Sequence, residues 1–376
     1  MMQAPIDPVA LTQALVRMST VNTPGHEDQC TNYLADLLEQ AGFTCRQVAF
    51  AERRNSLVAR LGNAAGGPPL AFTGHVDVVP LGNAPWTHDP FAANIVDGRM
   101  YGRGTSDMKS GVAAFTAAAI DMAPQIRDTA GVTLIITAGE ETGCEGAFHL
   151  VGQAETRDLM GNAGALIVAE PTSNEPLQGH KGALWLKVSA KGVTAHGSMP
   201  EHGDNAIYKI AQAALALKEF DFNVQAHPLM GNPTLNVGVI HGGLNINSVP
   251  DAAEILVDIR SVAGQTHDDI LRRVQEIVGS ELTVETLIDL ESVYTDPSDD
   301  WTRRVASFCP GGATSRIVSY FTDAAALRRP LGGPPTLILG PGDAHMAHQT
   351  DEYCPVYRIT EARDIYARAI EDWCLS

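Results

Sequence analysis

Closely spaced cysteines are absent from this sequence. Its six cysteines are scattered and form no C-x-x-C motif: Cys30, Cys45, Cys144, Cys309, Cys354 and Cys374. Six cysteines in a chain of 376 residues are too few for the disulfide framework of a small secreted domain, and their spacing fits no thiolate metal site. We therefore expect reduced thiols.

Long apolar runs and targeting signals are missing as well. The longest apolar run, around residues 132–138, has the length of a strand, whereas a membrane-spanning helix needs about 18 or more apolar residues. Residues 1–9 lack the basic and apolar regions of a signal peptide. These absences predict a cytoplasmic protein that does not act at a membrane.

Basic residues are scarce. The chain has 26 Lys and Arg against 44 Asp and Glu, which gives a formal net charge of −18. This balance argues against nucleic acid or an anionic membrane surface as a partner. It favours cations, because surplus carboxylates are the usual ligands of divalent metals.

Apolar residues are plentiful enough for a large core. They make up 44% of the chain and charged residues only 19%, which is a globular composition and excludes a disordered chain. A single core stops growing at roughly 250–300 residues, so 376 residues predict two domains.

The two ends of the chain alternate helices and strands. Helical periodicity covers residues 8–18, 26–41, 110–122 and 361–374. Strand-like runs, most of them almost wholly apolar, cover residues 55–61, 69–73, 131–137, 165–169, 317–320 and 336–339. This alternation predicts an α/β fold, with a mainly parallel mixed sheet sandwiched by helices.

The middle of the chain has a different pattern of expected strands and helices. Strands are expected at residues 183–191, 234–240, 253–259 and 282–288, and helices at 204–220 and 268–278. The order strand-helix-strand-strand-helix-strand is the split βαβ pattern of a small α+β domain. We therefore expect a catalytic domain built from residues 1–179 and 291–376, interrupted by an inserted lid or dimerisation domain of residues 180–290.

Metal-type ligands follow the apolar strands, where ligands of open α/β sheets collect. His75 and Asp77 come after the strand at 69–73, and as residues i and i+2 they point to the same side. A carboxylate so placed can accept the second ring N–H of a ligating histidine. The alternative is an ordinary buried histidine beside a solvated aspartate.

Asp107 lies in the glycine-rich loop of residues 102–111, which opens a helix. The loop matches neither G-x-x-x-x-G-K-[ST] nor G-x-G-x-x-G, which disfavours a phosphate site. The alternative to a metal ligand is an aspartate that only stabilises the helix N-terminus.

Glu140 and Glu141 follow the strand at 131–137. Adjacent carboxylates repel each other unless a cation lies near one of them. At the end of a strand their side chains diverge, so one can bind metal while the other faces substrate as a base.

Two further ligands complete the candidate set. Glu170 follows the strand at 165–169, and His348 lies in the segment 347–352, with His345 as the alternative. Imidazole and carboxylate ligands without thiolate suit two hydrolytic Zn²⁺ or Co²⁺ ions that share Asp107.

These motifs, in this order, resemble those of the M20-type metallohydrolases over about residues 9–373. Within that family the acetylornithine deacetylase group is the most similar, through residues 170–173, 180–182, 233–236, 240–243, 258–260 and 347–353. Two stretches depart from that group: residues 243–250, and residues 319–324, where Asp323 stands in place of a glutamate.

The resemblance implies a zinc-exopeptidase-like fold and a role for each ligand. His75 and Glu170 would hold one metal, Glu141 and His348 the other, and Asp107 would bridge them through a cis peptide to Met108. Two further residues would not bind metal: Asp77 would orient His75, and Glu140 would act as general base. The metals would be Zn²⁺, with Co²⁺ or Mn²⁺ as alternatives.

The resemblance also assigns residues of the inserted domain. His196 would stabilise the tetrahedral oxyanion, reaching across a homodimer, and Asn247 with Arg260 would hold the substrate carboxylate. The implied reaction is removal of the acyl group from a small N-acyl amino acid. The alternatives are a succinyl-diaminopimelate desuccinylase, a carboxypeptidase or dipeptidase, and a related hydrolase recruited to another C–N bond.

Overall fold

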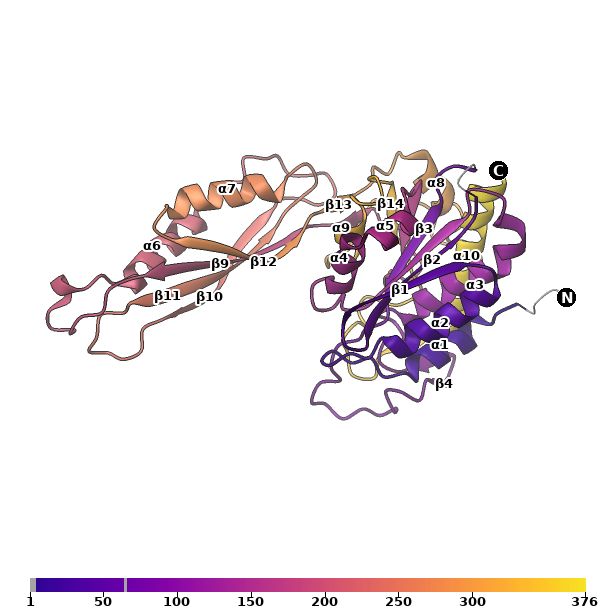
Figure 1. Cartoon of the computed structure of the whole chain (residues 1–376), viewed down its shortest axis with the longest axis horizontal. Helices are drawn as coiled ribbons and strands as arrows, with labels where there is room; N and C mark the ends of the chain where they lie inside the picture. Colours follow the sequence, from indigo (N-terminus) through magenta and orange to yellow (C-terminus); the bar gives the residue numbers. More distant parts are fainter. Residues whose placement is uncertain (1–4, 64–65) are drawn as a thin grey trace. The chain divides into compact units, whose positions relative to one another are not determined.

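The computed structural model describes residues 5–63 and 66–376 and divides the chain into two compact units (Figure 1). The first unit contains Met1–Gly179, Tyr294–Val318 and Thr322–Ser376, and the second contains His180–Val293 and Ser319–Phe321. Nothing in the sequence indicated that the short segment Ser319–Phe321 would group with the second unit. The lid and dimerisation roles of the inserted segment stay predictions.

A six-stranded mixed sheet forms the centre of the first unit. The strand order is β1-β2-β6-β3-β7-β14. The strands are β1 (Thr44–Ala51), β2 (Arg54–Leu61), β3 (Leu70–His75), β6 (Val132–Thr137), β7 (Ala165–Val168) and β14 (Thr336–Ile338). β6, β3, β7 and β14 run parallel, whereas β2 pairs antiparallel with β6 and β1 pairs antiparallel with β2. The predicted mainly parallel α/β sheet is confirmed.

Helices cover both faces of this sheet (Figure 1). One layer contains α1 (Pro8–Val16), α2 (Asp28–Gln40), α3 (Lys109–Ile126) and α10 (Val356–Leu375). The other contains α4 (Glu145–Gly152), α5 (Ala154–Met160) and α9 (Ala324–Leu327). Because both faces are covered, every residue of β3, β6 and β7 is buried, which explains their largely apolar sequences.

The main core lies between the sheet and the layer of α3 and α10. Phe72 of β3 packs against Phe115 and against Tyr366, with ring centroids 5.8 Å and 5.4 Å apart. α8 (Asp300–Ala306) adds Trp301, which meets Trp373 of α10 edge to face. These aromatic contacts hold α3 and α10 against the strands whose ends carry the candidate ligands.

A small sheet joins two distant parts of the first unit. β15 (Tyr353–Pro355) pairs with β5 (Arg99–Tyr101), and β5 pairs with β4 (Asn94–Val96), all antiparallel. The loop after β5 therefore lies beside the loop before β15. Among the residues described, no helix is long and apolar enough to cross a membrane.

The second unit is a four-stranded antiparallel sheet with the order β10-β11-β9-β12. Its elements are β9 (Ala183–Lys191), α6 (Ala206–Lys218), β10 (Thr234–Gly242), β11 (Ala252–Arg260), α7 (His267–Val278) and β12 (Thr283–Leu290). Both helices pack on one face of the sheet (Figure 1). Alternate residues of β9, such as Leu184, Leu186 and Val188, are buried under them, as the alternating sequence indicated.

A Ser–His–Asp chain closes one end of this sheet. The Ser261 hydroxyl lies 2.8 Å from His267 Nε2, and His267 Nδ1 lies 2.5 Å from Asp289 Oδ1. The side chain of Ser261 is completely buried. The three residues therefore tie the end of β11 to α7 and β12, and they offer no nucleophile to solvent.

Two sequence predictions differ from the structure. Residues 317–320 form no strand: only Val318 takes part in a bridge, and its N–H donates to the carbonyl oxygen of Gly179 in the short strand β8 (Gly179–His180) at 2.9 Å. The last helix starts at Val356, ahead of the expected residue 361, because it follows directly on β15. The sequence analysis also missed β1, a partly exposed edge strand with mixed polarity.

Candidate metal centre

The candidate ligands meet at the carboxyl edge of the parallel strands. His75 is the last residue of β3, Glu140 and Glu141 follow β6, and Glu170 follows β7. Parallel neighbours end at the same edge of a sheet, so residues far apart in the sequence converge there. His348 joins them from the loop between β14 and β15.

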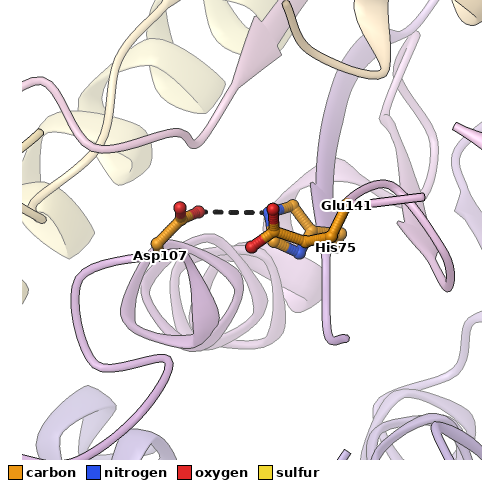
Figure 2. A group of neighbouring side chains, drawn as sticks. All are labelled: His75, Asp107 and Glu141. Atoms are coloured by element: carbon orange, nitrogen blue, oxygen red, sulfur yellow. Dashed lines mark hydrogen bonds and ion pairs between the residues drawn. The ribbon is translucent and has the colours of Figure 1, made fainter. Parts of the chain in front are cut away.

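Asp107 lies between two imidazoles. Its Oδ1 is 3.2 Å from His75 Nε2 and its Oδ2 is 3.4 Å from His348 Nε2. Figure 2 shows the first of these contacts, with Glu141 beside it. Each carboxylate oxygen thus faces a different histidine, which is the arrangement of a bridging ligand.

Each imidazole has a second carboxylate beside it. Glu170 Oε1 is 3.8 Å from His75 Nε2, and Glu141 Oε2 is 3.0 Å from His348 Nε2. The ligand atoms of His75, Asp107 and Glu141 lie within 4.8 Å of one another, as do those of His75, Glu140 and Glu170. The five predicted ligands therefore lie close together, but these two groups differ from those that the resemblance implies: Glu141 is grouped with His75, Glu140 takes part in the second group, and His348 is in neither.

The spacing and type of these donors fit zinc. Ligand atoms about 2.0–2.2 Å from a tetrahedral Zn²⁺ lie about 3.3–3.6 Å from each other, close to the distances found between these side chains. The Nδ1–H group of His75 donates to the Asp77 carbonyl oxygen at 3.0 Å, so Nε2 is the ring nitrogen that faces the carboxylates and would bind a metal. His345 is exposed, and no hydrogen bond from its ring to this cluster occurs in the described residues.

The crowding of carboxylates also favours a cation at this site. Burial raises the pKa of Glu170 well above its usual range, and the Asp107 carboxylate adds to the rise. Burial raises the pKa of Glu141 as well, again with repulsion from Asp107. Hydrogen bonds to Asp107 and Glu141 raise the pKa of His348 to about 10. In the absence of metal, protons on the imidazoles compensate the carboxylates, and divalent cations would replace them.

Asp77 acts on the turn that carries the two glutamates. Its carboxylate accepts the backbone N–H of Glu140 and of Glu141, each at 3.2 Å, and the Asn22 amide at 2.6 Å. The distance from Asp77 Oδ1 to His75 Nδ1 is 3.5 Å. Asp77 therefore contacts His75 mainly through its own carbonyl oxygen, while its carboxylate fixes Glu140 and Glu141, which the sequence did not indicate.

Glu140 is almost fully buried at the edge of the cluster, with 5% of its surface exposed. Burial raises its pKa well above the usual range, His75 opposes the rise, and the carboxylates of Glu170, Asp323 and Glu141 add to it. A buried carboxylate with a raised pKa beside a metal site has the properties of a general base.

His196, Asn247 and Arg260 belong to the second unit. The loops of His196 and Asn247 are adjacent, because the Gly197 N–H donates to the Asn247 carbonyl oxygen at 2.7 Å. Arg260 at the end of β11 pairs with Asp258 at 2.9 Å. Their proposed roles stay predictions.

Supporting residues escaped the sequence analysis. Arg54 is almost fully buried, pairs with Glu27 at 2.7 Å and donates to the Asn22 amide oxygen, so a chain of contacts leads to Asp77. Arg103 and Glu352 form a second buried pair next to Asp107. Both pairs join segments that are distant in the sequence. The signal that could have indicated the second pair is that Arg103 and Glu352 are charged residues within segments assigned to metal binding, 102–111 and 347–352.

Two glycines clamp the chain just before Glu170. A Cβ on Gly111 of α3, or on Gly340, would lie 2.2 Å from the Ala169 carbonyl oxygen. We expect Gly111→Ala to lose about 1–3 kcal/mol of stability through overpacking and to weaken zinc binding, since it displaces Glu170. Thermal unfolding and zinc titration measure both effects.

Gly152→Ala is the matched control for that variant. Gly152 also lies in a helix, and a Cβ there meets no atom within 4 Å. If Gly111→Ala were as stable as Gly152→Ala and bound zinc equally well, the clamp would have no role.

The sequence matches known proteins over most of its length. Residues 71–372 match the model of peptidase family M20/M25/M40. Acetylornithine deacetylase of Klebsiella pneumoniae (strain 342) is 33% identical over 366 residues, covering 91% of this chain and 90% of that protein.

Solved structures share the fold at lower identity. A tripeptidase from Staphylococcus aureus has a TM-score of 0.72 and 21% identity, covering 98% of this chain and 99% of that one. A Bacillus subtilis protein described as a dinuclear metal binding peptidase from the M20 family has a TM-score of 0.70 and 15% identity, covering 96% of each chain. The matched family model and the deacetylase relative together show that this chain belongs to peptidase family M20/M25/M40.

Proposed function

We propose that this protein is a metal-dependent amidohydrolase that removes the acyl group from an N-acyl amino acid at a centre for two divalent cations. The observation that carries the proposal is Asp107, whose two oxygens each face a different histidine. The relation to a deacetylase at 33% identity supports an N-acyl amino acid as substrate. Zn²⁺ is the proposed metal, because all the candidate donors are imidazole nitrogens and carboxylate oxygens.

The proposed residues divide the work of hydrolysis. Bound cations would polarise the substrate carbonyl and acidify a water molecule. Glu140 accepts a proton from the attacking water and then donates it to the departing amine, so one carboxylate serves both halves of the reaction. The Asp77 carboxylate keeps Glu140 in place by accepting the backbone N–H of Glu140.

The ring of His196 is oriented as a hydrogen-bond donor. The Ser198 backbone N–H donates to His196 Nδ1 at 3.2 Å, and the Ser198 hydroxyl lies 2.7 Å from the same nitrogen. A neutral imidazole that accepts at Nδ1 carries its proton on Nε2. This supports the proposal that His196 donates to the oxyanion of the tetrahedral intermediate.

Arg260 and Asn247 are the proposed contacts for the substrate carboxylate. Arg260 is already held by Asp258, which also accepts the Trp185 indole N–H at 3.0 Å. The guanidinium is thus oriented before substrate arrives, and a substrate carboxylate would have to compete with Asp258 for its donors.

A homodimer in the cytoplasm is proposed from the family resemblance. Exposed apolar side chains support self-association: Leu244 and Ile246, on the loop between β10 and β11, are 97% and 102% exposed. Where such side chains form a contiguous apolar patch, they mark a surface that another chain covers.

A substrate panel tests the proposed reaction. The zinc-loaded protein is incubated with N-acetyl-ornithine, N-succinyl-diaminopimelate, N-acetyl neutral amino acids and dipeptides, and amine release is measured. We expect turnover of an N-acyl amino acid and its loss after chelation of the metal. Turnover of dipeptides alone would show that the protein is a peptidase and not a deacylase. No turnover of any substrate would contradict the proposal.

A further inference from the structure

We propose that the buried ion pair Arg103–Glu352 positions two metal ligands, Asp107 and His348, and so joins the two halves of the proposed metal centre. Neither residue is among the candidate ligands. The pair links the loop after β5 to the loop before β15. The inference rests on the proposed function, because it assumes that Asp107 and His348 hold cations.

Glu352 organises the backbone of the Asp107 loop. Its side chain is completely buried. Oε1 accepts the backbone N–H of Ser106 at 2.8 Å and of Asp107 at 3.0 Å, and Oε2 accepts that of Gly104 at 3.0 Å. Three backbone N–H groups that converge on one carboxylate form an anion nest, and Asp107 itself supplies one of them.

Arg103 holds the loop of His348 from the other side. Its Nη1 donates to Glu352 Oε2 at 2.7 Å and to the Gln349 carbonyl oxygen at 3.3 Å. Its Nη2 donates to the His348 carbonyl oxygen at 3.4 Å. Only 1% of Arg103 is exposed, so these bonds form away from solvent.

His348 depends on such backbone support. Its side chain is 53% exposed, so packing fixes its ring only in part. Its backbone φ is +64°, in the left-handed region that non-glycine residues rarely adopt. Residues in that region keep their conformation only where the surroundings hold them.

Stability alone does not explain the pair. A buried ion pair is often no better for stability than apolar side chains of similar volume, because both charges lose their hydration. A planar guanidinium with several donors can, however, bond a carboxylate and two carbonyl oxygens at the same time. The pair therefore suits a positioning role.

Two variants test separately the contact of the ion pair with the His348 loop and its contact with the Asp107 loop. Arg103→Lys keeps the charge and can still reach Glu352, but its one nitrogen cannot occupy the positions of both Nη1 and Nη2, which hold the two carbonyl oxygens of the His348 loop. Glu352→Gln turns one carboxylate oxygen into a donor that faces backbone N–H groups, which disturbs the Asp107 loop.

Zinc titration of the metal-free protein against a chromophoric chelator tests the proposal. We expect two binding events in the wild type. Arg103→Lys should weaken one event by about 10–100-fold and spare the other, whereas Glu352→Gln should weaken both by about that factor. Thermal unfolding of each metal-free variant establishes that it is folded, and Arg103→Lys carries the test if Glu352→Gln does not fold.

Val305→Ala is the control for a general loss of stability. Val305 is fully buried in the core of the first unit and lies in α8, outside the centre. Folded variants of Arg103 and Glu352 with wild-type zinc affinity would overturn the inference, as would an equal loss of affinity in Val305→Ala. Fewer than two events in the wild type would contradict the proposed function itself.

Discussion

Glu140→Gln is expected to lose nearly all turnover while keeping its fold and both zinc ions. General acid–base catalysis typically contributes about 10²–10⁴-fold, and the amide of glutamine can neither accept nor return a proton at neutral pH. Glutamine has almost the same shape, so the bond from its backbone N–H to Asp77 should persist. Steady-state kinetics and zinc content measure the two parts of this prediction.

Glu155→Gln is the matched control, because it makes the same change on an exposed helix of the same unit, where the side chain is 80% exposed. It should retain full activity. The position of Glu140 offers one clear alternative: its carboxylate lies close enough to His75 and Glu170 to share a metal ion with them. Loss of one zinc ion from Glu140→Gln would therefore make Glu140 a ligand, and near-wild-type turnover would remove it as the base.

Asp107→Asn is expected to lose both zinc ions and all measurable turnover. The substitution keeps the shape of the side chain but removes its charge and turns one coordinating oxygen into an NH₂ group. Hydrogen bonds with His348 and His75 outweigh burial and keep the pKa of Asp107 below its usual range, so the native side chain is ionised. Affinity should fall by more than the 10–100-fold typical of residues that only support a ligand.

His348→Asn is the comparison variant for Asp107. His348 faces Glu141 and one oxygen of Asp107, so its loss should remove one zinc ion and leave the ion held by His75 and Glu170. Isothermal titration with Zn²⁺ distinguishes the two patterns. If Asp107→Asn kept one binding event at wild-type affinity, Asp107 would not bridge two cations.

The sequence predicted the sheet and the ligands for the same reason. A parallel strand covered on both faces is mostly apolar, so β3, β6 and β7 stand out in the sequence, and the candidate ligands His75, Glu140 and Glu170 lie at or just after their ends. The strand β1 did not stand out, because it is half-exposed at the edge of the sheet and carries Arg46 and Gln47 among apolar residues.

The supporting residues could not be predicted, because their partners are far apart in the chain. Nothing local to Glu352 indicates that it accepts the backbone N–H of Asp107, and nothing local to Asp77 indicates that its carboxylate holds Glu140 and Glu141. Such contacts follow from the packing of loops at the sheet edge. Sequence motifs identify residues by type and spacing, whereas the direction of a hydrogen bond depends on the folded backbone.

The most direct test of a centre for two cations at Asp107 is anomalous diffraction at the zinc absorption edge from crystals of the zinc-loaded protein. The account predicts two peaks on either side of Asp107, one next to His75 and Glu170 and the other next to His348 and Glu141. A single peak, or peaks that do not touch Asp107, would contradict it.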